Sequence, residues 1–198
     1  MIRVAVIDPQ PAVRAGLALL LRAEPGLVPV GSAAGAADAN ELLTREQPAV
    51  VLLDPRLRDG DGIALCRRLK GEGAAARIVL YTEPDDELEL LARIAGADGI
   101  VDKAAAPIEL FDAIRRVARG ESALPPLRRD QLDAAAHRVD PEDLALLSML
   151  VDRTPLDDVA ATLRLTRSRL SRRTERLLGR LRHPAAAKPA AQQQRALA

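Results

Sequence analysis

The stretch that decides the fold is Val50-Val51-Leu52-Leu53-Asp54, an apolar run that ends in one carboxylate. A continuous run of aliphatic residues is typical of a strand buried on both faces of a parallel sheet, whereas a half-exposed strand alternates. Asp54 then lies where the strand leaves the sheet. In open α/β sheets this carboxyl edge is where ligands bind. We therefore expect Asp54 to belong to an acidic site at the strand ends.

Strand and helix patterns alternate on both sides of this run. The further predicted strands are residues 2–7, 27–32, 77–81 and 100–101. Helical spacing follows each strand, in the stretches from Val13 to Leu21, at 38–46, 63–70 and 86–95, and from Pro107 to Gly120. Five strand–helix units in alternation predict an α/β fold, with a doubly wound five-stranded parallel sheet and helices on both faces.

The residues at the predicted strand ends form a chemically coherent set. They are Asp8, Asp54, Thr82 and, one step past the last strand, Lys103. Carboxylates can hold a divalent cation, one of them can accept a phosphoryl group, and a hydroxyl and an ammonium can bind the phosphoryl oxygens. The sequence thus predicts a phosphoryl-accepting site at this edge.

Residues 1–120 resemble the receiver domain of two-component response regulators, whose flavodoxin-like sheet has the order 2-1-3-4-5. The residues that carry the resemblance are Asp8, Asp54 in VVLLDPRL, Gly60-Asp61-Gly62, Thr82, Gly96-Ala97-Asp98-Gly99 and Lys103. The resemblance implies that Asp54 is the phosphoacceptor, with Asp8, Thr82 and Lys103 completing the receiver active site. It also implies a Mg²⁺ ion held by Asp8, Asp54 and Arg56, and a sensor histidine kinase as partner.

Three positions depart from the family pattern. Pro9 replaces a second acid that usually follows Asp8, so a magnesium ion loses a ligand and a charge. Ile100 stands where the family usually has a switch Tyr or Phe, and Arg56 and Arg58 add two cations beside Asp54. Two interpretations stay open: conventional phosphorylation, or a relic site held by a Lys–Asp ion pair. We favour the second.

A linker and a second domain follow. Residues 121–139 contain Pro125-Pro126 and predict a linker with a short helix at 129–137. From Asp140 the helix signals are clear, with caps expected at Asp140, Thr154 and Thr166. Expected inward residues of the first and third helices are Leu144, Leu147, Met149, Leu150 and Val151, then Leu170, Leu177, Leu178 and Leu181. Three short helices with a tight turn at Arg164-Leu165 predict a helix-turn-helix domain at 140–183, followed by a disordered tail at 184–198.

The last predicted helix carries the positive charge. Eight arginines lie between Arg164 and Arg182, against Glu175 as the one acid. In the second helix of a helix-turn-helix, arginine reaches guanine edges and phosphates. Residues 141–182 resemble the LuxR-type helix-turn-helix of the NarL/FixJ class, which implies DNA binding. The expected DNA-binding residues are Arg167, Ser168, Arg169, Ser171, Arg172, Arg173 and Arg176.

Charge and cysteine content agree with this organisation. Residues 1–120 carry 15 basic and 18 acidic side chains, a net of −3, whereas residues 121–198 carry a net of +4, so the halves are expected to have different partners. Cys66 is the single cysteine, expected to be buried and inert. With neither a signal peptide nor an apolar run near 18 residues, we expect a cytoplasmic protein without membrane contact.

The leading hypothesis is therefore a DNA-binding transcription regulator with an atypical receiver, acting as a homodimer or as a heterodimer with a related regulator. It is not expected to be an enzyme, because no Ser–His–Asp, Cys–His or metal–histidine set exists in the sequence. The alternative is a protein-interaction module, in which a degenerate receiver binds a partner protein and the arginine-rich helix does not read DNA.

Overall fold

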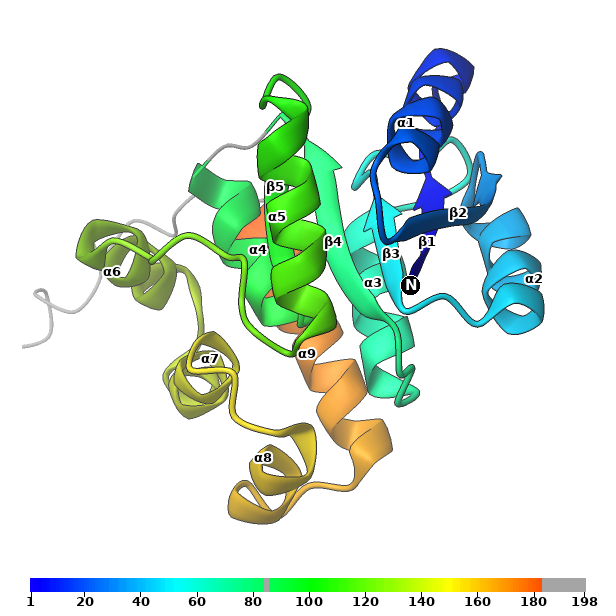
Figure 1. Cartoon of the computed structure of the whole chain (residues 1–198). Coiled ribbons are helices and arrows are strands. Elements are labelled where there is room, and N and C mark those ends of the chain that lie inside the picture. Colours follow the sequence, from blue (N-terminus) through cyan, green and yellow to red (C-terminus); the bar gives the residue numbers. More distant parts are fainter. Residues whose placement is uncertain (84–85, 183–198) are drawn as a thin grey trace, which may run out of the picture.

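The computed structural model describes residues 1–83 and 86–182. A five-stranded parallel sheet with the order β2-β1-β3-β4-β5 forms the centre of the N-terminal part (Figure 1). Its strands are β1 (Ile2–Ile7), β2 (Leu27–Ala33), β3 (Val50–Leu53), β4 (Arg77–Thr82) and β5 (Gly99–Asp102). The predicted doubly wound α/β fold is confirmed, and β3 has the predicted bounds.

Helices cover both faces of the sheet. They are α1 (Pro11–Ala23), α2 (Ala36–Glu46), α3 (Gly62–Gly71), α4 (Asp86–Ala95) and α5 (Pro107–Ala118). Buried residues of α1 and α5 share one apolar cluster, and those of α2, α3 and α4 share the other. Cys66 of α3 is fully buried, as expected, and burial raises the pKa of its thiol to about 12.

Strand β3 explains why the decisive run of sequence is continuously apolar. Val50 and Leu52 belong to the cluster under α1 and α5, whereas Val51 and Leu53 belong to the cluster on the opposite face. All four side chains are at most 1% exposed. Because β3 is flanked by β1 and β4, neither its faces nor its edges meet solvent, and an alternating pattern would bury polar groups.

The C-terminal part is helical. It consists of α6 (Arg129–Arg138), a 3₁₀ turn η1 (Pro141–Asp143), α7 (Leu144–Val151), α8 (Leu156–Thr162) and α9 (Arg167–Arg182). The short helix expected inside the linker is present as α6. Arg164, between α8 and α9, has φ +51°, the left-handed conformation of a tight turn. The helix-turn-helix of α8 and α9 is where the sequence predicts it.

The details of capping and burial differ from expectation before α9. Thr166 caps α9 as predicted, accepting a hydrogen bond from the Arg169 amide at 3.3 Å. Asp140 is the N-cap residue of the 3₁₀ turn, as predicted, but its side chain makes no capping hydrogen bond and pairs with Arg180 instead. The prediction for Thr154 is wrong, because the N-cap of α8 is Pro155. Since the chain enters α7 through a tighter 3₁₀ turn, the phase of the helix changes. Leu144 is consequently 40% exposed, and Leu146 joins Leu147 and Leu150 in the core.

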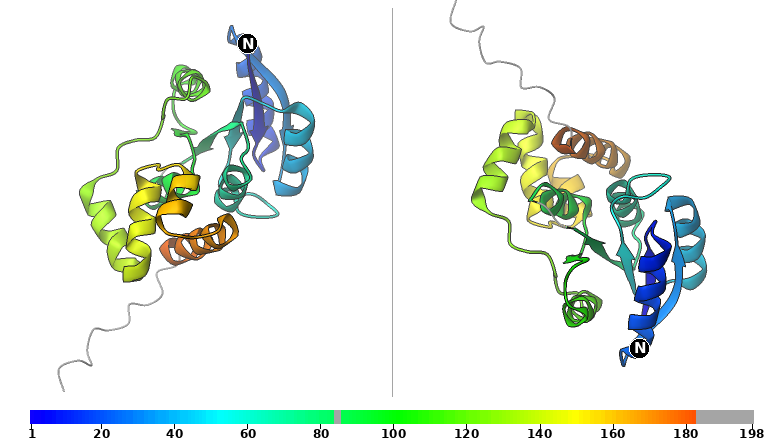
Figure 2. Two further views of the ribbon diagram at one scale, coloured as in Figure 1. Left: turned by 90° about the horizontal axis from the view of Figure 1, so that it is seen from below. Right: turned by 90° about the horizontal axis from the view of Figure 1, so that it is seen from above.

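The two halves of the chain pack against each other. Helix α4 contacts α6, α7 and α9, and α3 also contacts α9, as the views from above and below show (Figure 2). The apolar cluster of α2, α3 and α4 continues into the buried leucines of α7 and α9. Polar contacts reinforce it, with Arg153 Nη2 3.1 Å from Asp98 Oδ1 and Arg138 Nη2 2.9 Å from Glu87 Oε1, together with an Arg182–Asp61 ion pair.

The domain limits at residues 120, 139 and 183 stay predictions. The predicted tail at 184–198 lies outside the described residues. Within residues 1–83 and 86–182, no helix is both long enough and apolar enough to cross a membrane.

Hydrogen bonds to Asp59 and a close approach at Gly62 fix the loop after β3. Asp59 accepts hydrogen bonds from the Ala36 and Ala37 amides at 2.8 and 3.0 Å, so it caps α2 from a distant position. These amide hydrogen bonds lower the pKa of Asp59. A Cβ on Gly62 would lie 2.3 Å from the Asp54 carbonyl oxygen. The loop therefore passes directly over the backbone of Asp54.

We predict that Gly62→Ala destabilises the protein, because the added methyl group would push the Asp54 backbone out of place. Overpacking of this kind costs about 1–3 kcal/mol. Gly16→Ala on α1 is the matched control: its Cβ meets nothing within 4 Å, and the substitution should stabilise the helix by about 0.5–1 kcal/mol. Urea unfolding measures both. Equal stability of Gly62→Ala and wild type would contradict the close approach.

Candidate receiver and nucleic-acid sites

The carboxyl edge of the sheet brings the predicted acids and the lysine together. Lys103 Nζ lies 2.6 Å from Asp8 Oδ2 and 2.5 Å from Asp54 Oδ2. Asp8, Asp54 and Lys103 directly follow β1, β3 and β5, so the ion pairs join the ends of three strands. Thr82, at the end of β4, is buried, and its carbonyl accepts a hydrogen bond from the Lys103 amide at 2.9 Å.

The second oxygen of each carboxylate is held by backbone. The Gln10 amide donates to Asp8 Oδ1 at 2.7 Å, and the Arg56 amide donates to Asp54 Oδ1 at 2.6 Å. Asp8 and Asp54 are 1% and 6% exposed. Burial alone would lower the pKa of Lys103, but its hydrogen bonds to Asp54 and Asp8 and their charges outweigh burial and raise that pKa. The ammonium therefore stays protonated between two carboxylates.

The resemblance to receiver domains implies a bound Mg²⁺ ion, so we ask whether the oxygen atoms around Asp8 and Asp54 could coordinate one. Mg²⁺ needs octahedral oxygen coordination and usually takes one or two carboxylates. Here both carboxylate oxygens that face one another are bound by the Lys103 ammonium, and Pro9 contributes no side-chain oxygen. The residues fit a tightly held Mg²⁺ poorly, because a lysine already supplies the positive charge between the acids.

The two arginines of the following loop do not take over that role. Arg56 and Arg58 are exposed, and among the described residues no ion pair joins either guanidinium to Asp54. Arg56 contributes its backbone amide to Asp54 and a β-bridge to Asp61. Lys103, from a strand end far along the chain, supplies the compensating charge.

The sequence did not single out two further side chains around the site. The Tyr81 ring lies beneath Lys103, with Nζ 5.9 Å from its centroid, within range of a cation–π contact. Arg14 Nη1 donates to the Asp8 carbonyl at 2.7 Å. The sequence predicted a strand that includes Tyr81. It did not show that the Tyr81 ring lies next to Lys103, because that contact depends on how β4 and β5 are aligned in the sheet.

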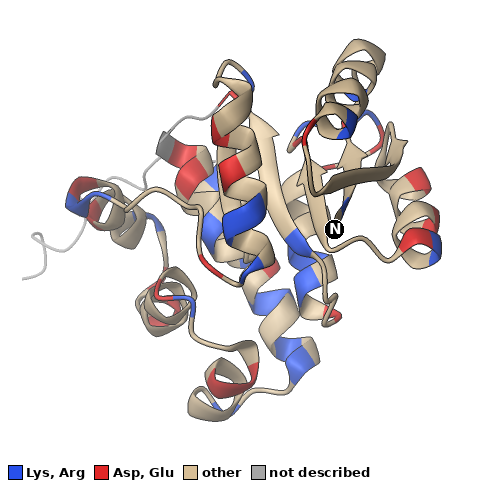
Figure 3. Ribbon diagram, in the orientation of Figure 1, with Lys and Arg blue, Asp and Glu red and all other residues tan. Residues whose placement is uncertain are grey.

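Arginines recur along α9 (blue in Figure 3), and some of them pair with acids while others do not. Arg182, at the end of the helix, pairs with Asp61 of the N-terminal half. Arg167, Arg173 and Arg180 are bound to Asp157, Asp143 and Asp140 within the C-terminal domain. Arg169, Arg172 and Arg176 are exposed and line one open surface hollow. Among the described residues none of these three forms an ion pair, although Arg172 donates to the Ser168 hydroxyl at 3.2 Å.

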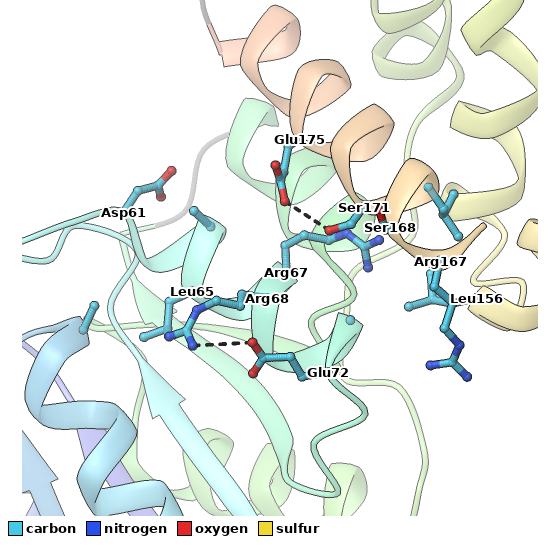
Figure 4. Close-up of a pocket in the computed structure, with 14 residues that line it drawn as sticks. Asp61, Leu65, Arg67, Arg68, Glu72, Leu156, Arg167, Ser168, Ser171 and Glu175 are labelled. Carbon is cyan, nitrogen blue, oxygen red and sulfur yellow. Dashed lines mark hydrogen bonds and ion pairs between the residues drawn. The ribbon is translucent and has the colours of Figure 1, made fainter. Parts of the chain in front are cut away.

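The structure therefore separates the predicted DNA-binding residues. Arg169, Arg172 and Arg176 are available for an outside anion, whereas Arg173 is half-buried and also donates to the Glu142 carbonyl. Ser171 hydrogen-bonds to Glu175 at 3.1 Å. Ser168, Ser171 and Arg167 face a cavity between α9 and α3 (Figure 4). These assignments stay predictions.

A sheet with a buried aspartate–lysine cluster at its edge, joined to a helix-turn-helix, defines the two-component regulator class. A family model described as the response regulator receiver domain matches residues 4–115. The DNA-binding transcriptional activator DevR/DosR of Mycobacterium tuberculosis (strain ATCC 25618 / H37Rv) is 34% identical over 192 residues, covering 91% of this chain and 88% of the relative. The chain belongs to the response regulators of the NarL/FixJ type.

Further comparisons agree. The nitrate/nitrite response regulator protein NarL of Escherichia coli (strain K12) is 24% identical, covering 90% of this chain and 88% of the relative. The crystal structure of a LuxR-family two-component response regulator from Aurantimonas sp. SI85-9A1 has a TM-score of 0.60 at 34% identity, covering 64% of this chain and 91% of that one. These relatives are regulators, and no catalytic family is indicated.

We predict that Lys103→Met destabilises the protein at neutral pH by about 3 kcal/mol, because removal of one partner leaves buried carboxylates uncompensated. A raised pKa in the folded state means that the lysine's contribution is fully present below its unfolded pKa, about 10.4. The contribution is lost as the pH rises through the higher folded pKa. The gap between variant and wild type should therefore be constant from pH 7 to 9 and narrow above about pH 10.4.

Urea titrations at several pH values measure this gap. Arg119→Met is the control, since it removes an exposed ion pair with Glu121 and should change stability little. A Lys103→Met variant as stable as wild type at pH 7 would show that the ammonium does not hold the two strands together.

Proposed function

We propose that this protein is a DNA-binding transcription regulator whose receiver works without conventional phosphorylation. The observation that carries DNA binding is the surface of Arg169, Arg172 and Arg176 on α9, the second helix of the helix-turn-helix. These cations are exposed and lack carboxylate partners among the described residues, which favours phosphate and guanine contacts. Relatives of the chain named as DNA-binding regulators support the same role.

The packing of α9 suggests how the receiver controls that role. A recognition helix in the major groove has groove walls on both sides. One side of α9 instead lies against α3 and α4, and ion pairs that include Arg153–Asp98 join the described residues of the two halves. The two halves must therefore separate before α9 can insert fully. On palindromic DNA the protein would act as a homodimer or with a related regulator.

The atypical receiver is supported by the geometry around Asp54. A phosphoryl group on Asp54 Oδ2 would require the Lys103 ammonium to move from that oxygen to the phosphoryl oxygens, and Pro9, which has no side-chain oxygen, weakens the magnesium site. Regulation would accordingly depend less on phosphorylation by a sensor histidine kinase than on a signal that changes the packing of the two halves.

DNA binding is tested by gel shifts on genomic fragments at several salt concentrations. Binding should weaken steeply with salt, and Arg169→Ala with Arg176→Ala should reduce the slope of log affinity against log salt by about 1.8, since each neutralised phosphate contributes about 0.9. Arg22→Ala on α1, which is exposed, should leave the slope unchanged. We avoid Arg173, because its ion pair with Asp143 is part of the domain core. Salt-insensitive binding, or none, would favour the protein-interaction alternative.

Phosphorylation is tested separately with acetyl phosphate and Mg²⁺. We expect no mass increase by intact-protein mass spectrometry, and an Asp54→Asn variant that binds DNA as wild type does. A gain of one phosphoryl group that Asp54→Asn abolishes, accompanied by a change in DNA affinity, would establish ordinary receiver signalling instead.

A further inference from the structure

A buried arginine without a partner lies between the two halves of the chain. Arg67, on α3, is 4% exposed, and burial lowers the pKa of its guanidinium. Its Nε is fully enclosed and has no hydrogen-bond acceptor. In residues 1–83 and 86–182 no hydrogen bond or ion pair reaches any nitrogen of this side chain. A buried charge in this state is destabilising unless an anion compensates it.

Arg67 faces a cavity of about 550 Å³ between α3 and the start of α9. Its guanidinium extends toward Ser168 and Ser171 of α9 (Figure 4). The Ser168 hydroxyl accepts a hydrogen bond from Arg172 and keeps its own hydrogen to donate to an oxyanion held by Arg67, whereas the Ser171 hydroxyl donates to Glu175. This volume is in the range of small-molecule sites.

The remaining walls define the other part of a ligand. Leu65 of α3, Leu156 of α8 and Leu170 of α9 line the cavity with apolar carbon. The other charges at the cavity are already engaged: Arg68 lies 3.7 Å from Glu72, Arg167 2.6 Å from Asp157, and Asp61 binds Arg182. Glu175 hydrogen-bonds to Ser171, and it attracts Arg67 without contacting it.

We propose that this cavity binds a small organic anion, with a carboxylate or phosphate group on Arg67 and an apolar body against the three leucines. The helices that form the site, α3 and α9, belong to different halves of the chain. The ligand therefore binds the protein only while the two halves are packed together. Linkage then requires that the ligand stabilise this arrangement. If α9 reads DNA as proposed above, the same ligand competes with DNA, because Ser168 and Ser171 lie on the occupied side.

The binding experiment needs no DNA, so its failure is distinct from failure of the proposed function. Isothermal titration calorimetry of the full chain uses benzoate and phenyl phosphate as probes, with benzamide as the neutral analogue of benzoate. We expect saturable binding of both anions at one site. Benzamide should bind at least tenfold more weakly, because it cannot pair with the guanidinium.

Arg67→Met keeps an unbranched, flexible side chain and removes the charged guanidinium. It should weaken benzoate binding at least tenfold and raise the midpoint of thermal unfolding without ligand, since an uncompensated buried charge is lost. Arg22→Met, at an exposed position on α1, is the matched control and should change neither quantity. A lower melting midpoint for Arg67→Met would show that Arg67 is already compensated, and would overturn the inference.

Ser171→Asp tests the site without touching Arg67. The new carboxylate would pair with the guanidinium from within the chain, so it should abolish benzoate binding and raise the melting midpoint. Equal affinity of benzoate for wild type, Arg67→Met and Ser171→Asp, or equal affinity of benzoate and benzamide for wild type, would overturn the proposal.

Discussion

The ammonium of Lys103 between the carboxylates of Asp8 and Asp54 is the interaction on which the receiver edge depends. Parallel strands that end together bring their terminal carboxylates together, and two buried like charges repel. Backbone amides satisfy one oxygen of each acid, but only a cation can bridge the two that face one another. Lysine at the end of β5 does so with a side chain that is 17% exposed, and it thereby couples the last strand to the first and third.

This solution limits the chemistry of the same edge. With an acid at position 9, the site would carry an excess negative charge that a divalent metal ion could neutralise. With Pro9 the charges are two carboxylates and one ammonium, which leaves less attraction for a second cation. The substitution that removes a ligand therefore also makes the lysine a better substitute for the metal.

Much of the fold follows from the sequence because the strands are buried on both sides. Val50–Leu53 has to lie in the sheet interior, and helical spacing after each strand leaves little choice of topology. Charged strand ends could be identified for the same reason. What the sequence did not show are contacts that depend on how separate elements dock: the Arg153–Asp98 ion pair, the cap that Asp59 supplies to α2, and the exposure of Leu144 after a 3₁₀ turn.

The arginines of α9 show why amino-acid composition alone could not define the DNA-binding surface proposed for this helix. Eight arginines in one short stretch suggested a uniform basic face, yet Arg167, Arg173, Arg180 and Arg182 are consumed by acids of the same chain. An arginine paired with aspartate contributes little field for a distant phosphate, since the opposite charges largely cancel beyond a few ångströms. The effective positive surface is reduced to Arg164, Arg169, Arg172 and Arg176, which are exposed.

The other side of α9 is fitted to the receiver, with Leu177, Leu178 and Leu181 in an apolar cluster that extends into α3 and α4. One helix thus presents exposed cations on one side and packs against the receiver on another. If α9 binds DNA as proposed, any signal that changes the free energy of this packing also changes the access of DNA to the helix, wherever on the receiver the signal acts. Chemistry at Asp54 is one means of doing so, and its absence would leave the coupling itself intact.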